Sequence, residues 1–134
     1  MIRVTLDTNE YISAFAFRGR SLQLIHRALN GEIEICISEA ILNETLRVLR
    51  EKFEWPAYDL HSLRERLSKT CYLVEPTETV AILTDDPDNR ILECAAQSRS
   101  QFLDTEDTAI LRLEQYRDAV IVTLAEFAQL LGTL

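Results

Sequence analysis

The sequence predicts an α/β fold, in which helices cover both faces of a central sheet of five parallel strands, as a three-layer α/β/α sandwich. Three observations lead to this prediction. Short apolar runs predict strands, segments with helical apolar spacing separate them, and glycine and proline are too scarce for long flexible linkers among the 134 residues. Strands that alternate with helices are typical of a mostly parallel sheet.

The first strand has the clearest pattern. Ile2, Val4 and Leu6 alternate with Arg3 and Thr5. This period-two spacing indicates a strand. All the expected strands are residues 2–6, 33–37, 71–74, 101–103 and 119–122.

Helices are expected between these strands, because apolar residues there recur three and four positions apart. Asn30-Gly31 ends one helix, Ser38 is a suitable N-cap for the next, and Trp55-Pro56 separates two more. The expected helices are residues 10–17, 20–30, 39–53, 57–69, 89–99, 108–114 and 124–131.

Length and composition favour one globular domain over residues 1–134. The chain is 47% hydrophobic, and no apolar run reaches transmembrane length. Since no leader-like run precedes the first strand, we expect a cytoplasmic protein with no membrane partner. The three cysteines have no CxxC spacing, so we expect buried thiols rather than a zinc site.

Charge is unevenly distributed along the chain. The net charge of −8 argues by composition against a nucleic-acid binder. Residues 75–107 nevertheless hold nine acids against two bases, and residues 47–69 hold six bases against four acids. An acidic cleft beside a basic shelf would suit a metal-dependent enzyme that acts on a polyanion. Ordinary solvated helix surfaces account for the basic region equally well.

Four carboxylates are expected at the carboxyl edge of the sheet, where open α/β sheets bind ligands. Asp7 directly follows the first strand. Asp88 and Asp107 each precede apolar residues by three and four positions, which places them on the buried faces of two helices. Glu44 lies on the flank of the apolar stripe of residues 39–53.

The chemistry of this set favours a metal ion. Buried carboxylates repel one another unless they are protonated or neutralised by a cation. Oxygen ligands without His or Cys select Mg²⁺ or Mn²⁺, and such ions suit phosphodiester hydrolysis. Each acid alone has a structural interpretation as a helix cap, a turn residue or an exposed charge. Only the joint arrangement favours a metal site.

Four segments carry a resemblance to a known family. They are VTLDTN at residues 4–9, ISEAILNE at 37–44, DPDNRILECA at 86–95, and FLDTED at 102–107 followed by Ile110-Leu111. In these segments the chain resembles the PIN domain family, which has a Rossmann-like fold and includes the VapC-like toxin ribonucleases of toxin–antitoxin pairs. The resemblance spans essentially the whole chain.

The resemblance implies a divalent-metal-dependent endoribonuclease, the toxin of a toxin–antitoxin pair. By resemblance the catalytic ligands of Mg²⁺ or Mn²⁺ would be Asp7, Glu44, Asp88 and Asp107, with Asp104 as a further candidate. Polar residues that orient these ligands or the scissile phosphate would be Asn9, Ser38 and Thr105. The implied partners are an RNA substrate, a small antitoxin and a second copy, for which residues 10–29 and 57–67 could supply an interface.

The segment at 104–107 departs from the family pattern. An apolar residue and a glycine are usual where this chain has Asp104 and Glu106. Glycine there would permit a positive φ. This departure leaves a second hypothesis open, a catalytically weak or inactive PIN-like domain that binds RNA or a protein. Nucleotide binding is excluded because the chain has no glycine-rich phosphate loop.

Overall fold

Five parallel strands and one short antiparallel strand form the sheet in the computed structural model, which describes residues 1–132. The strand order is β3-β2-β1-β4-β6-β5. The bounds are β1 (Arg3–Leu6), β2 (Glu34–Ser38), β3 (Tyr72–Val74), β4 (Phe102–Asp104), β5 (Gln115–Tyr116) and β6 (Ala119–Val122). The broad α/β prediction is confirmed.

The prediction of five strands, all parallel, was wrong in one respect. The sheet has a sixth strand, β5, which pairs antiparallel with β6 through Gln115–Val120 and Tyr116–Ala119. Two residues are too few to leave a period-two pattern. The hairpin between them turns at Arg117, whose φ of 53° is reached without the glycine that usually marks such a turn.

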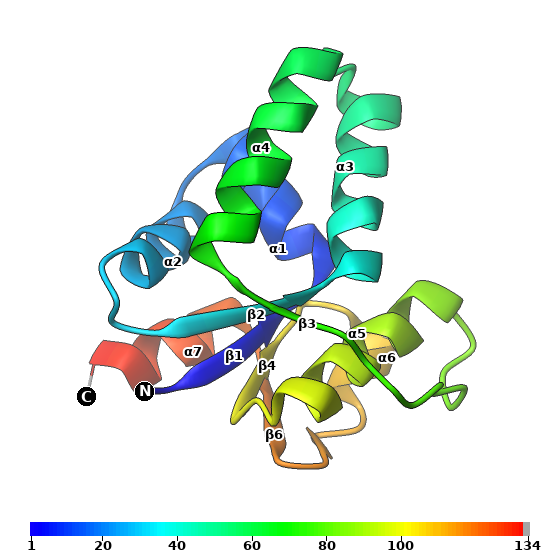
Figure 1. Ribbon diagram of the computed structural model, residues 1–134. Helices are drawn as coiled ribbons and strands as arrows, with labels where there is room; N and C mark the ends of the chain where they lie inside the picture. The colour runs from blue at the N-terminus through cyan, green and yellow to red at the C-terminus, as the bar shows by residue number, and fades with distance from the viewer. Residues whose placement is uncertain (133–134) are drawn as a thin grey trace.

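Helices lie on both faces of the sheet (Figure 1). The bounds are α1 (Thr8–Ile12), α2 (Arg20–Leu29), α3 (Glu39–Phe53), α4 (Ala57–Thr70), α5 (Asp86–Ser98), α6 (Thr108–Leu111) and α7 (Leu124–Gly132). Figure 1 shows α1, α3 and α4 above the sheet and α5 below it. Helices on the faces are expected here, because parallel strands need crossover connections that pass over the sheet.

The helix expected at residues 10–17 takes a different form. Helix α1 begins at Thr8, directly after Asp7, and continues as a π-helical segment, η1 (Ser13–Phe17). Asp7 acts as the N-cap of α1 because its side chain accepts a hydrogen bond from the Asn9 backbone N–H. The start of α1 is therefore tied to the end of β1.

The core lies between the sheet and its helices. Val4, Ile35, Ile37 and Leu103 are fully buried, as expected for strands covered on both faces, and Leu42 of α3 is fully buried against them. All three cysteines are free and buried, as predicted. No helix within residues 1–132 is both long enough and apolar enough to cross a membrane.

The sheet topology fixes the place of the candidate site. Strand β1 pairs with β2 on one side and with β4 on the other, so the direction of the chain reverses across β1. In open α/β sheets ligands bind outside the carboxyl ends of the strands at such a reversal. Asp7 follows β1 at this edge, and its backbone N–H donates to the Asp104 carbonyl at 3.0 Å.

Candidate metal centre

Asp7 is a buried carboxylate held by two elements. Its side chain is 5% exposed. Oδ1 accepts the Asn9 backbone N–H at 3.3 Å, and Oδ2 accepts the Thr105 hydroxyl at 2.6 Å. Burial raises the pKa of Asp7, and the hydrogen bond from Thr105 opposes this increase. The group is therefore costly to ionise without a compensating charge.

Thr105 couples the ends of β1 and β4. Its hydroxyl donates to Asp7 and accepts the backbone N–H of Asp107 at 2.9 Å. Both bonds depend on the Thr105 backbone, which is held by a hydrogen bond from its N–H to the Val122 carbonyl at 3.0 Å. The residue thus orients one acid of the predicted quartet and positions the backbone of another.

Asp107 is the N-cap of α6. Its Oδ1 accepts the backbone N–H groups of Ala109 at 2.9 Å and Ile110 at 3.1 Å. Among the described residues, these are the bonds its side chain makes, and both use the same oxygen. The cap interpretation of Asp107 is therefore correct, and Oδ2 remains available for a ligand.

Asp88 lies in the first turn of α5 and is mostly buried. Burial raises its pKa to about 6, with further contributions from the negative charges of Asp107, Asp85 and Asp7. These contributions show that Asp88 lies near two other members of the quartet. Their mutual repulsion is the condition under which a bound cation stabilises a carboxylate site.

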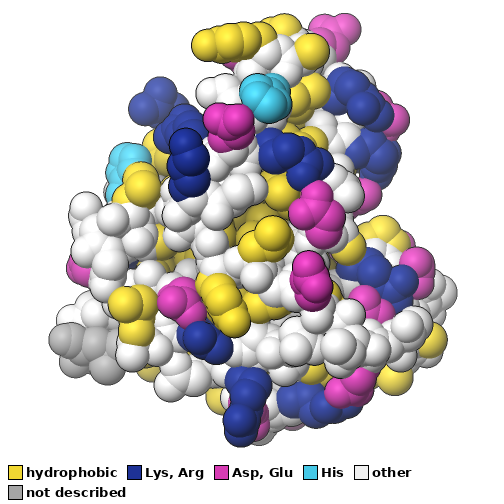
Figure 2. Space-filling view, in the orientation of Figure 1, with side chains coloured by type: hydrophobic (Ala, Val, Ile, Leu, Met, Phe, Trp, Pro, Cys, Tyr) yellow, Lys and Arg dark blue, Asp and Glu magenta, His cyan; other side chains and the backbone are white. Residues whose placement is uncertain are grey.

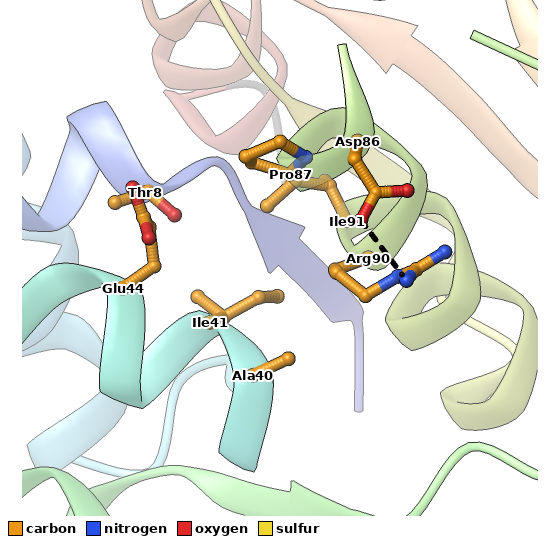
Figure 3. A pocket seen from close by; sticks show the side chains of 8 residues that line it. All are labelled: Thr8, Ala40, Ile41, Glu44, Asp86, Pro87, Arg90 and Ile91. Atoms are coloured by element: carbon orange, nitrogen blue, oxygen red, sulfur yellow. Dashed lines mark hydrogen bonds and ion pairs between the residues drawn. The ribbon is translucent and has the colours of Figure 1, made fainter.

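Glu44 reaches the site from α3. Its carboxylate binds Arg47, with 2.6 Å between Oε1 and Nη2 and 3.2 Å between Oε2 and Nε. Figure 3 shows the Glu44 side chain beside Thr8, across a cleft from Pro87, Arg90 and Ile91 of α5. The cleft has a volume of about 200 Å³.

A neighbouring cavity, also of about 200 Å³, brings the predicted quartet together. Four different elements supply its acids. Those of the predicted set that line it are Asp7, Glu44, Asp88 and Asp107. Among residues 1–132, however, no three of these carboxylates have oxygens within 4.8 Å of one another. A cation shared by three of them therefore needs ligating waters or a shift of the side chains.

The predicted polar residues have different positions. Asn9 lines the cavity, and Thr105 lies behind it. Ser38 caps α3, because its hydroxyl oxygen accepts the Ile41 backbone N–H at 3.3 Å. Ser38 thus acts at a distance, by fixing the start of the helix that carries Glu44.

Asp104 is not among the residues that line this cavity. Its carboxylate instead lies in a separate acidic group with Glu10 and Glu106. Glu10 was not predicted, although its position three residues after Asp7 in a helix was a usable signal. Glu106 does not have a positive φ, so the chain here does not adopt the backbone conformation for which a glycine was expected.

Two basic residues also line the cavity. Arg47 and Lys52 extend from α3 beside the acids. Figure 2 shows further Lys and Arg side chains over α3 and α4, in the upper half of the view. The acidic cavity and the mildly basic surface predicted from residues 47–69 are therefore adjacent.

These features define a class of protein: an open α/β domain with a candidate carboxylate metal centre at the reversal point of its sheet. A family model described as a PIN domain matches residues 3–109. The chain therefore belongs to the PIN domain family, and the matched residues include the whole predicted quartet.

Solved structures share this fold. VapBC-1 from nontypeable Haemophilus influenzae has a TM-score of 0.63 at 15% identity, covering 92% of this chain and 99% of that chain. VapBC2 from Rickettsia felis, bound to a DNA fragment from their promoter, has a TM-score of 0.63 at 14% identity, covering 91% and 98%. FitAcB from Neisseria gonorrhoeae has a TM-score of 0.55 at 15% identity, covering 91% and 98%. No curated protein matches the chain.

Proposed function

We propose that this protein is a divalent-metal-dependent endoribonuclease and the toxin component of a toxin–antitoxin pair. One observation carries the proposal: Asp7, Glu44, Asp88 and Asp107 reach one cavity from four separate elements. Family membership supports a nuclease, because cleavage of nucleic acid is the activity that the PIN resemblance implies. The likeness to VapBC-1, VapBC2 and FitAcB supports the toxin role and an antitoxin partner.

The donor set fits a hard divalent cation. The quartet offers carboxylate oxygens, and the cavity lining within residues 1–132 includes no His or Cys, which suits Mg²⁺ or Mn²⁺. The raised pKa values of Asp7 and Asp88 fit as well, because a nearby cation favours their ionised forms. When bound, the ion would lower the pKa of a coordinated water and polarise a phosphoryl oxygen.

The chain's own residues would prepare the site for RNA. Thr105 holds Asp7 in one orientation, and Ser38 fixes the start of the helix that carries Glu44. Arg47 and Lys52 place positive charge at the cavity, where they would bind the phosphates on either side of the scissile bond. The net charge of −8 disfavours binding of a polyanion to the protein as a whole, so positive charge beside the cavity would be needed to hold RNA there.

Cleavage of labelled RNA with added Mn²⁺ or Mg²⁺ tests this function. We expect wild-type protein to cleave, and Asp7→Asn and Asp88→Asn to lose at least 100-fold of the rate while remaining folded. Asp118→Asn is the matched control. Asp118 is an exposed acid just before the amino end of β6, whereas the cavity lies at the carboxyl edge of the sheet. Equal cleavage by wild type and both cavity variants would overturn the proposal.

A second function, a PIN-like binding module without catalysis, has two observations in its favour. Arg47 already neutralises Glu44, and the quartet is more open than a tight metal site. This alternative predicts no metal-dependent cleavage by wild type, and partner binding that is unchanged in Asp7→Asn. The RNA assay therefore distinguishes the two functions.

We also propose that this chain forms a homodimer. Three large apolar side chains are exposed on or beside the segments expected to form a homodimer, namely Phe17, Leu29 and Tyr58. Replacement of Phe17 and Tyr58 by serine is expected to convert a dimer to a monomer in analytical ultracentrifugation. A wild-type protein that sediments as a monomer at micromolar concentration would contradict the homodimer.

A further inference from the structure

A second group of carboxylates lies beside the candidate centre. Glu10 comes from α1, Asp104 ends β4, and Glu106 lies in the connection between β4 and α6. Each offers one oxygen, and these oxygens all lie within 4.8 Å of one another. Glu10 and Asp104 are buried, whereas Glu106 is exposed, so the group extends from the protein interior to the surface.

Asp104 is the unusual member. Its side chain is 0% exposed, and neither Oδ1 nor Oδ2 has a hydrogen-bond partner within residues 1–132. A buried polar group without a partner costs roughly 1–3 kcal/mol, and an ionised one costs more. Native structures rarely retain such a group without a compensating ligand, water or function. The unpartnered oxygens of Asp104 therefore point to a ligand that the protein atoms do not supply.

The surroundings supply little positive charge. Glu10 accepts the Ser21 hydroxyl at 3.3 Å, and Glu106 accepts the Leu124 backbone N–H at 3.0 Å. None of the ion pairs formed within the described part of the chain involves any of the three carboxylates. Within the described residues the group therefore has few hydrogen-bond donors and no positively charged partner.

The spacing of the oxygens suits a hard divalent cation. Two ligands on opposite sides of an ion lie about twice the metal–oxygen distance apart, which is about 4.2 Å for Mg²⁺ and about 4.6–5.2 Å for Ca²⁺. The observed spacing within 4.8 Å reaches this range without rearrangement of the backbone. Burial and mutual repulsion also raise the pKa of Asp104 to about 9 and that of Glu10 to about 7, as expected where a cation is needed to ionise both groups.

We propose that Glu10, Asp104 and Glu106 form a second divalent-cation site, separate from the cavity lined by Asp7 and Asp88. The two sites adjoin through Thr105, which lies between Asp104 and Glu106 in the chain and donates its hydroxyl to Asp7. An ion in the second site would therefore hold the 104–106 segment, and with it the Thr105 hydroxyl, in place. Asp104 and Glu106 are also the positions at which this chain departs from the family pattern.

The site does not depend on RNA cleavage, so it is tested in protein without the primary site. Asp88→Asn serves as the background, because Asp88 lines the cavity from α5 and is not one of the three carboxylates of the second group. Mn²⁺ and Ca²⁺ are titrated by calorimetry into Asp88→Asn, Asp88→Asn/Asp104→Asn and Asp88→Asn/Glu10→Gln. The matched control is Asp88→Asn/Asp118→Asn. Thermal melting with and without each ion gives a second readout.

We expect Asp88→Asn and the Asp118 control to keep one saturable Mn²⁺ site and a higher melting temperature with Mn²⁺. The Asp104→Asn and Glu10→Gln doubles should lose at least tenfold in affinity and lose the thermal shift. Circular dichroism checks that each variant is folded. If one double variant does not fold, the other still tests whether the second group binds the ion. Absence of saturable binding in Asp88→Asn, or equal binding in all four proteins, would overturn the site.

The outcomes separate this inference from the proposed function. RNA cleavage by wild type together with no ion binding in Asp88→Asn would refute the second site alone. Ion binding in Asp88→Asn with no cleavage by wild type would refute the nuclease alone. If the second site is refuted in this way, Asp104 and Glu10 are protonated in the folded protein instead of binding a cation.

Discussion

The Thr105 hydroxyl donates a 2.6 Å hydrogen bond to Oδ2 of Asp7, and so joins the ends of two strands that are adjacent in the sheet but far apart in the chain. The same hydroxyl oxygen accepts the Asp107 backbone N–H. One side chain therefore sets the distance between two acids of the candidate centre, and its removal should affect both.

Replacement of Thr105 by valine is expected to weaken Mn²⁺ binding by about 10–100-fold, the usual effect of losing a residue that orients a metal ligand. Valine keeps the shape but cannot donate to Asp7. Thr105→Ser keeps the hydroxyl and should bind within threefold of wild type. Calorimetry at fixed pH measures both, and equal losses in the two variants would show that packing rather than the hydrogen bond is responsible.

Mn²⁺ affinity is expected to rise with pH through the titration of Asp88. Burial raises the pKa of this group to about 6, so below that pH an ion must displace a proton. For one displaced proton the gain should be about fivefold between pH 5 and 6 and should level off above pH 7. Calorimetry in buffers of different ionisation enthalpy gives the number of protons released. A pH-independent affinity would contradict an ionised Asp88 ligand.

Asp104→Asn is expected to stabilise the metal-free protein, more at pH 8 than at pH 5. Burial raises the folded-state pKa of Asp104 to about 9 from 3.8, so the unfolded state ionises first as pH rises. Wild-type stability therefore falls between about pH 4 and 9, and asparagine removes this contribution. We expect a gain of about 1–3 kcal/mol at pH 8, because a buried carboxylate without partners is replaced.

Urea denaturation in EDTA at the two pH values measures the free energy of unfolding in wild type and Asp104→Asn. Asp118→Asn serves again as the exposed control and should show no such dependence on pH. A wild-type protein whose stability is constant between pH 5 and 8 would mean that another charge or a tightly held ion compensates Asp104.

Arg47→Ala is expected to weaken RNA binding without abolishing the metal site. Each lost phosphate contact lowers the dependence of log affinity on log salt by about 0.7 for single strands. Arg47→Ala also removes the cation paired with Glu44, so Mn²⁺ affinity should rise rather than fall. Binding is measured on a labelled RNA in Asp7→Asn, which is expected not to cleave it.

Lys69→Ala is the control for this variant, because Lys69 lies in α4 and does not line the cavity. An equal change of salt dependence in Lys69→Ala and Arg47→Ala would show that RNA contacts the basic surface generally. Loss of RNA binding only in Arg47→Ala would place the phosphate path at the cavity.

Local sequence patterns predicted most of the elements that carry the site. The alternation at Ile2, Val4 and Leu6 ends at Asp7, so the strand end and its acid were visible together. Helical spacing identified Asp88 and Asp107 at the starts of two helices, because the side chain of a first-turn residue shares a face with those three and four positions later.

Elements without a local pattern were missed. Strand β5 has two residues and a turn at Arg117 with no glycine, and η1 has the apolar content of an ordinary helix. Backbone hydrogen bonds to neighbours, rather than residue periodicity, define both. Their positions follow only from the assembled sheet and the packing of α1.

By itself the sequence determined the alternation of strands and helices, the acid Asp7 at a strand end and the other acids that could share a metal site with it. It could do so because periodicity and capping are local properties of the chain. Tertiary structure alone decided which acids meet. The side-by-side pairing of β1 and β4 brought Asp104 to Glu10 rather than into the cavity, and the packing of α3 against α1 and α5 brought Glu44 to the cavity. Such juxtapositions depend on strand order and helix packing, which leave no trace in residue spacing.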